Sequence, residues 1–142
     1  MKLSATTVAI GSALMCISTA AEADYIAPCS PPDSNIHVVP FPSGMPAYLL
    51  KELVEHVGDI ASPDDRFDST DVRITGRNRR VIFVWNRGVR YVVATEHGGI
   101  GYNDPILVYE VDPQNRRARL ISEKIAFPTT VCETSKGLIA AE

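Results

Sequence analysis

The sequence predicts an α+β fold, in which one amphipathic helix of residues 45–58 packs on an antiparallel meander of four or five strands within residues 72–125. Three observations carry this prediction. Apolar residues recur at helical spacing in the stretch before residue 58, and five β-rich segments follow that stretch. The breaks between these segments are too short to hold crossover helices, so neighbouring strands are expected to run antiparallel.

The helix is expected where leucine and valine line one face. The apolar side consists of Leu49, Leu50, Leu53, Val54 and Val57, and the polar side of Lys51, Glu52 and Glu55. Pro46 suits the first turn of this helix, and Gly58 suits its end.

The strands are expected in segments separated by turn-forming residues. They are Val72–Thr75, Val81–Trp85, Val89–Thr95, Ile106–Val111 and Leu120–Ile125. The second segment is apolar at every position, which is typical of a strand buried on both faces. One helix covers only one face of a sheet. The proline-rich residues 24–42 are expected to cover the other face, and a homo-oligomer or a partner protein is the alternative.

The proline-rich segment also predicts the first strand. Its five prolines exclude a helix and leave only Ile36–Phe41 as a short edge strand. The expected order is then a strand, the helix and four or five antiparallel strands. This order resembles that of cystatin-like folds, in which the sheet wraps the helix. The resemblance concerns architecture alone, because the sequence shows no cystatin inhibitory motif.

The N-terminus has the features of a secretory signal peptide. Lys2 precedes an apolar run from Val8 to Ile17, and the small-residue ending Ala21-Glu22-Ala23 follows. The run has about half the roughly 20 residues that a transmembrane helix needs. We therefore expect residues 1–23 to be cleaved, residues 24–42 to form a proline-rich segment, and residues 43–142 to form a single domain. The expected location is periplasmic or secreted.

Two cysteines remain after the expected cleavage. Cys29 and Cys132 lie near the two ends of the mature chain and should form a disulfide in an oxidising compartment. Two free thiols are the alternative. Acylation of Cys16 is disfavoured, because the preceding Met15 is bulkier than the residue that a lipoprotein signal requires.

Charge is unevenly distributed along the chain, whose net charge is −3. Residues 52–71 hold seven acids and one arginine, whereas residues 72–95 hold six arginines and no acid. An acidic partner surface would suit the arginines. A solvated hairpin tip that protects the strands is the alternative. Export and the negative net charge argue against a nucleic acid partner.

The predicted binding surface centres on the loop of residues 96–104. In a meander this loop shares an end of the sheet with the turn at residues 76–80, so the predicted partner contacts are His97, Tyr102, Asn103, Arg77 and Arg79. The glycines at 98, 99 and 101 open no helix, which argues against a dinucleotide site. Glu96 or Asp104 could orient His97 as a base, but the loop has no serine or cysteine nucleophile.

No catalytic residue, metal ligand or cofactor is therefore predicted. The aspartates after Asp59 lack the glycine and glutamate of a calcium loop, and the three histidines show no zinc spacing. The function expected is an exported protein-recognition module, such as a periplasmic inhibitor or immunity protein of a cell-wall hydrolase. The alternatives are a module that binds a small molecule or envelope ligand, and a structural subunit that oligomerises through the sheet.

Overall fold

The computed structural model describes residues 29–67, 77–99 and 101–141. The predicted signal peptide and the predicted strand Val72–Thr75 lie outside these residues. The described elements are β1 (His37–Val38), α1 (Ala47–Val57), β2 (Arg79–Arg87), β3 (Arg90–His97), β4 (Asp104–Asp112), β5 (Arg117–Ala126) and α2 (Val131–Ala140).

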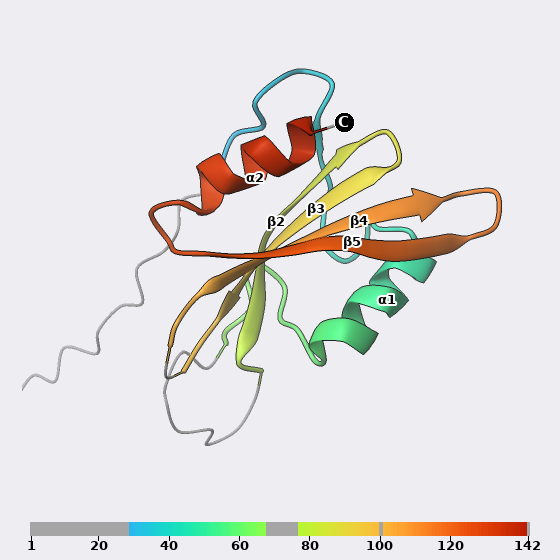
Figure 1. The fold of residues 1–142 in the computed structure, drawn as a ribbon. Coiled ribbons are helices and arrows are strands. Elements are labelled where there is room, and N and C mark those ends of the chain that lie inside the picture. The colour runs from blue at the N-terminus through green and yellow to red at the C-terminus, as the bar shows by residue number, and fades with distance from the viewer. Residues whose placement is uncertain (1–28, 68–76, 100, 142) are drawn as a thin grey trace, which may run out of the picture.

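The five strands form one antiparallel sheet in the order β1-β2-β3-β4-β5 (Figure 1). This confirms the predicted α+β class and the antiparallel meander. The short strand predicted in Ile36–Phe41 is present as β1, which pairs with Trp85 and Asn86 near the C-terminal end of β2. The cystatin-like order stays an expectation, since the chain adds a second helix that the expected order lacks.

Helix α1 covers one face of the sheet, as its periodicity predicts. Leu49 and Leu53 are fully buried and pack in one cluster with Val81, Val93, Leu107 and Tyr109 of the strands. Burial of each leucine side chain contributes about 1.5–3 kcal/mol. Gly58 ends the helix with a φ of 81°, a conformation that favours glycine.

Helix α2 covers the opposite face, so the sheet lies between two helices (Figure 1). Its buried residues Val131, Ser135 and Ile139 recur every four positions and face Trp85, Val92 and Ile106. The sequence predicts the proline-rich segment as the cover of this face, and the structure corrects this in part. Ile36 and Cys29 of that segment reach the same cluster, but α2 supplies the helix that packs on the strands.

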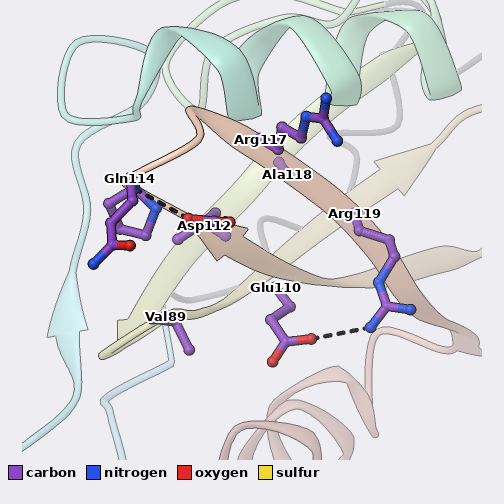
Figure 2. Close-up of a pocket in the computed structure, with 9 residues that line it drawn as sticks. Val89, Glu110, Asp112, Gln114, Arg117, Ala118 and Arg119 are labelled. Carbon is purple, nitrogen blue, oxygen red and sulfur yellow. Dashed lines mark hydrogen bonds and ion pairs between the residues drawn. The ribbon is translucent and has the colours of Figure 1, made fainter.

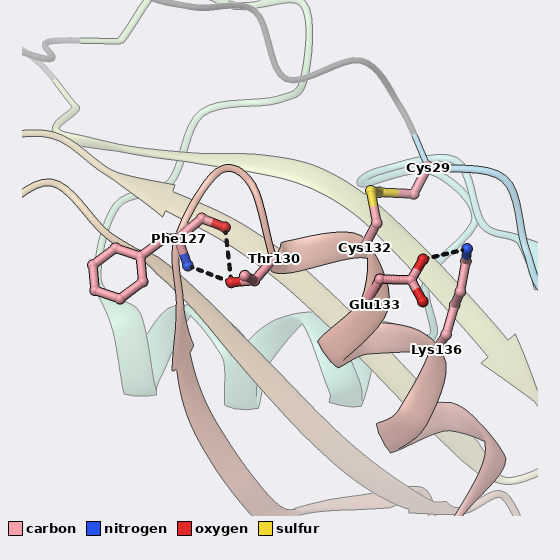
Figure 3. Close-up of a disulfide and its surroundings, with 6 residues drawn as sticks. All are labelled: Cys29, Phe127, Thr130, Cys132, Glu133 and Lys136. Atoms are coloured by element: carbon pink, nitrogen blue, oxygen red, sulfur yellow. Dashed lines mark hydrogen bonds and ion pairs between the residues drawn. A yellow bond between two sulfur atoms is a disulfide. The ribbon is translucent and has the colours of Figure 1, made fainter.

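The predicted disulfide joins Cys29 to Cys132 on α2, with a Cα–Cα distance of 5.6 Å (Figure 3). It links residues 103 positions apart in the sequence. Closing a loop of this length restricts the unfolded chain by about 4–5 kcal/mol in the loop-entropy model. The disulfide therefore fastens the N-terminal segment to the helix that shelters the second face.

Candidate functional site

The loop of residues 98–103 joins β3 to β4 at the end of the sheet where β2 begins. Arg79 pairs directly with His97, and Arg80 pairs with Glu96. The amide of His97 donates to the carbonyl of Asn103 at 2.9 Å, which closes the loop. Because side chains alternate along a strand, Arg79 and His97 lie on the α1 face, whereas Arg80 and Glu96 lie on the α2 face.

A polar pocket of about 290 Å³ lies on the α1 face at this end. It is lined by Val57, Gly58, Asp59, Arg77, Asn78, Arg79 and His97. The amide nitrogen of Asn78 lies 3.0 Å from Nε2 of His97 and donates to it when that nitrogen is unprotonated. The pocket thus combines guanidinium, imidazole and amide groups at the end of α1.

The two arginines of the pocket differ in their bonding. Nε of Arg77 donates to Asp59 at 2.8 Å, and Nη1 of Arg77 lies 3.6 Å from Asp65. Arg77 is therefore neutralised by two aspartates of the acidic connector, residues 59–67, which follows α1. Arg79 is half-buried and forms no side-chain hydrogen bond or ion pair with any residue that the structure describes. The guanidinium of Arg79 is therefore a charge in this pocket that no described residue pairs, and we call it uncommitted.

A second group of polar residues lies on the α2 face of the same end. Register places Arg80, Glu96 and Asp104 side by side on β2, β3 and β4. Arg80 forms an ion pair with Glu96, and its guanidinium stacks 4.4 Å from the ring centre of Phe67. The hydroxyl of Tyr102 donates to Glu96 at 2.6 Å. Glu96 is almost fully buried and accepts from both neighbours.

Asp104 lacks such partners. Its side chain is fully buried, and neither carboxyl oxygen has a hydrogen-bond partner among the residues that the structure describes. Burial raises the pKa of Asp104 from 3.8 to about 7, and the nearby charge of Glu96 adds to this rise. Burial and the hydrogen bond to Glu96 likewise raise the pKa of Tyr102 above its ordinary value. Near neutral pH Asp104, within this group of buried polar residues, is therefore partly protonated.

The structure brings some of the predicted contact residues together and separates others. Arg77, Arg79 and His97 line the same pocket. Tyr102 instead turns its hydroxyl to the buried Glu96 on the other face. The side-chain amide of Asn103 donates to the carbonyl of Gly101 at 2.7 Å and stabilises the loop itself. The loop thus supplies fewer free polar groups than its composition suggests.

The idea that Glu96 or Asp104 orients His97 is wrong. Glu96 bonds Arg80 and Tyr102 on the α2 face, and Asp104, on the same face, bonds no residue of the described ranges. Asn78 is the partner observed at Nε2 of His97. The sequence contains one indication that Glu96 points away from His97. Glu96 lies two positions after Ala94 and therefore shares the face of the buried strand residues.

Another pocket, of about 420 Å³, lies at the opposite end of the sheet, near the tip of the β4–β5 hairpin (Figure 2). Its two acidic side chains, Glu110 and Asp112, are already paired. Glu110 bonds Arg119 at 3.2 Å, and the carboxylate of Asp112 accepts from the backbone amides of Gln114 and Asn115. The side-chain amide of Asn115, which donates to Asp112 at 2.7 Å, lowers the pKa of Asp112 below its usual range, and the two backbone amides add to this effect. Arg117, the charged group of this pocket that no described residue pairs, is exposed to solvent, whereas Arg79 is half-buried.

Within the described residues, no set of three or more histidine, cysteine, aspartate or glutamate side chains is arranged to hold a metal ion. Across the same residues, neither helix is long and apolar enough to cross a membrane. No protein-family model matches the chain, and neither the curated proteins nor the solved structures contain a match to it.

Proposed function

We propose that this protein is an exported protein-recognition module, and that the pocket around Arg79 accepts a carboxylate from its partner. The observation that carries the proposal is the uncommitted guanidinium of Arg79, half-buried beside His97 and Asn78. A guanidinium in a partly desolvated pocket binds a carboxylate with two parallel hydrogen bonds. Aspartate and glutamate side chains on a partner protein supply that group.

Rigidity of the scaffold supports the same proposal. The pocket lies at the junction of β2 and β3, which pair over their whole length, and α1 packs on them from the pocket side. A preorganised surface loses little conformational entropy when it binds. By analogy with small exported proteins that occupy enzyme clefts, the partner class proposed is a cell-wall hydrolase. The Cys29–Cys132 disulfide is compatible with export.

The test is a comparison of capture by three forms of the mature, oxidised protein. Wild type, Arg79→Ala and Arg116→Ala are immobilised and exposed to the same envelope extract. Arg116 is an exposed arginine in the turn between β4 and β5 and serves as the matched control. Wild type and Arg116→Ala are expected to capture a partner recognised through the pocket equally, whereas Arg79→Ala captures about tenfold less, which corresponds to about 1.4 kcal/mol.

Equal capture by all three forms would refute the role of Arg79. Native mass spectrometry of the purified protein separates the remaining alternatives. A bound small anion that Arg79→Ala loses would identify a small-molecule module. A dimeric mass for all three forms would identify a structural subunit.

A further inference from the structure

The two edges of the sheet are built differently. The outer edge of β2 is covered at one end by β1, which has two residues, and at the other end by the bridge between Ala61 and Arg80. Pro40 follows β1 closely and limits its extension. Short edge segments next to proline are a known protection against unwanted strand pairing.

Strand β5 forms the other edge and is much longer than β1, although Pro128 follows it as Pro40 follows β1. It contains ten residues, lacks proline, and pairs only with β4 among the described elements. Three large apolar side chains along it are exposed: Ile121 at 39%, Ile125 at 58% and Phe127 at 61%. Figure 3 shows the ring of Phe127 directed away from α2 and the disulfide. A long edge with exposed apolar residues is a template for an added strand.

The register limits where such a strand can pair. Val108 pairs with Ser122 and Tyr109 with Leu120, so Ile121 is an extra residue that bends β5. The straight run after the bulge is Ser122–Ala126, and Phe127 follows it directly. This run is about the length of an ordinary strand.

The charges along β5 distinguish between possible occupants. Glu123 bonds His56 of α1 at 3.2 Å, and Arg119 bonds Glu110. Arg117 and Lys124 are exposed and form no ion pair with any residue in the described ranges. The charges that remain uncommitted on this edge are therefore positive.

A second copy of the chain is a poor occupant. Arg119 pairs with Glu110 and Lys124 with Ile106, so Arg117, Arg119 and Lys124 all project on the α2 face. Antiparallel pairing of β5 with itself keeps this face common to both copies and brings these cations together. Like charges across strands are destabilising. Acidic side chains on a different partner would instead complement them.

We propose that the run Ser122–Phe127 binds an extended acidic segment of a partner protein, which adds to the sheet as a sixth strand beside β5. The backbone of the run supplies the hydrogen bonds of the new ladder. Ile125 and Phe127 contact apolar side chains of the segment, and Lys124 selects for acidic ones. This surface is formed by β5 and is separate from the pocket around Arg79.

The test uses two synthetic peptides of about eight residues, the length of an ordinary strand. One alternates glutamate with valine, and the other alternates lysine with valine. Each is titrated into the mature, oxidised protein while backbone amide signals are followed by NMR. The glutamate peptide is expected to shift the signals of residues 120–127 and to leave those of β1 unchanged. The lysine peptide is expected to cause no such shift.

Variants distinguish charge-selective binding of the peptides from nonspecific binding. Lys124→Glu is expected to weaken binding of the glutamate peptide about threefold or more and to permit binding of the lysine peptide. Lys51→Glu, a charge reversal on the exposed side of α1, should change neither. Arg79→Ala should also leave peptide binding intact, so a failure of the pocket and a failure of this surface are distinguishable.

Three results would overturn the proposal. The first is the absence of any shift in β5 at millimolar peptide. The second is equal binding of both peptides with no effect of Lys124→Glu. The third is a shift of the β5 signals with protein concentration alone, which would show that a second copy occupies the edge.

Discussion

The buried carboxyl group of Asp104 predicts an unusual dependence of stability on pH. Asp104 ionises with a pKa of about 7 in the folded protein, against an ordinary value of 3.8. Below about pH 4 both the folded and the unfolded chain hold this proton. Between these two values the unfolded chain releases it while the folded chain keeps it, so stability falls as pH rises. Above about pH 7 the loss is complete.

The size of the effect follows from the same two values. Each pKa unit of difference corresponds to about 1.4 kcal/mol, so about three units correspond to an upper limit of about 4 kcal/mol. Asp104→Asn keeps the shape of the side chain and removes its ionisation. The variant is therefore expected to gain stability relative to wild type as pH rises from about 4 to about 8, by an amount that approaches this limit.

The assay is urea denaturation of wild type and Asp104→Asn at intervals across that pH range. The amide of the variant adds a constant difference, which is read near pH 4 and subtracted. Asp64→Asn, the same replacement at an exposed position, is the control for the loss of one aspartate carboxyl group. A difference between wild type and Asp104→Asn that stays constant from about pH 4 to about pH 8 would refute the reasoning.

Two further predictions concern contacts that hold the loop and the second helix. Tyr102→Phe removes a hydrogen bond to the buried carboxylate of Glu96 and should lower the free energy of unfolding by about 2 kcal/mol in urea denaturation, so an unchanged denaturation midpoint would contradict this role. Replacing both Cys29 and Cys132 with serine should lower it by about 4 kcal/mol and loosen α2 over Trp85, which tryptophan fluorescence reports; unchanged stability and fluorescence would contradict it.

The hydrogen bond from Tyr102 to the buried Glu96 changes how binding can be tested. The composition of the loop suggests Tyr102 as an exposed contact whose loss would weaken binding without changing the melting temperature. Because its hydroxyl stabilises the fold, a Tyr102 variant confounds binding with stability. Arg79, which has no side-chain partner among the described residues, is the better probe.

The elements that periodicity marks clearly were predicted well. The leucine stripe at Leu49 and Leu53 predicted α1, and the breaks at residues 86–88 and 112–115 predicted the hairpins of the meander. Helix α2 was missed. The buried face of α2 includes Ser135 between Val131 and Ile139, and the helix also contains Gly137. A small polar residue and a glycine weaken the helical signal that an apolar stripe would give.

The candidate site was predicted only in outline. The common end of the sheet for residues 77–79 and 97 follows from meander topology, which the sequence suggests. Arg79 and Arg80 are adjacent in a strand and so lie on opposite faces, but which of them faces α1 depends on the β-bulge between Val81 and Phe83, which the sequence does not specify. The engagement of Arg77 by Asp59 depends on where the acidic connector lies in space.

The sequence by itself determined the class of the fold, the helix on one face and the cysteine pair that closes the chain, because local periodicity and composition are enough for each. Only the tertiary structure decided which charges neutralise one another and which remain free. Glu96 and Asp104 lie eight positions apart in the sequence, yet strand pairing makes them direct neighbours in a buried row. Burial and proximity together raise the pKa of Asp104, and both arise from packing between strands, which no local pattern records.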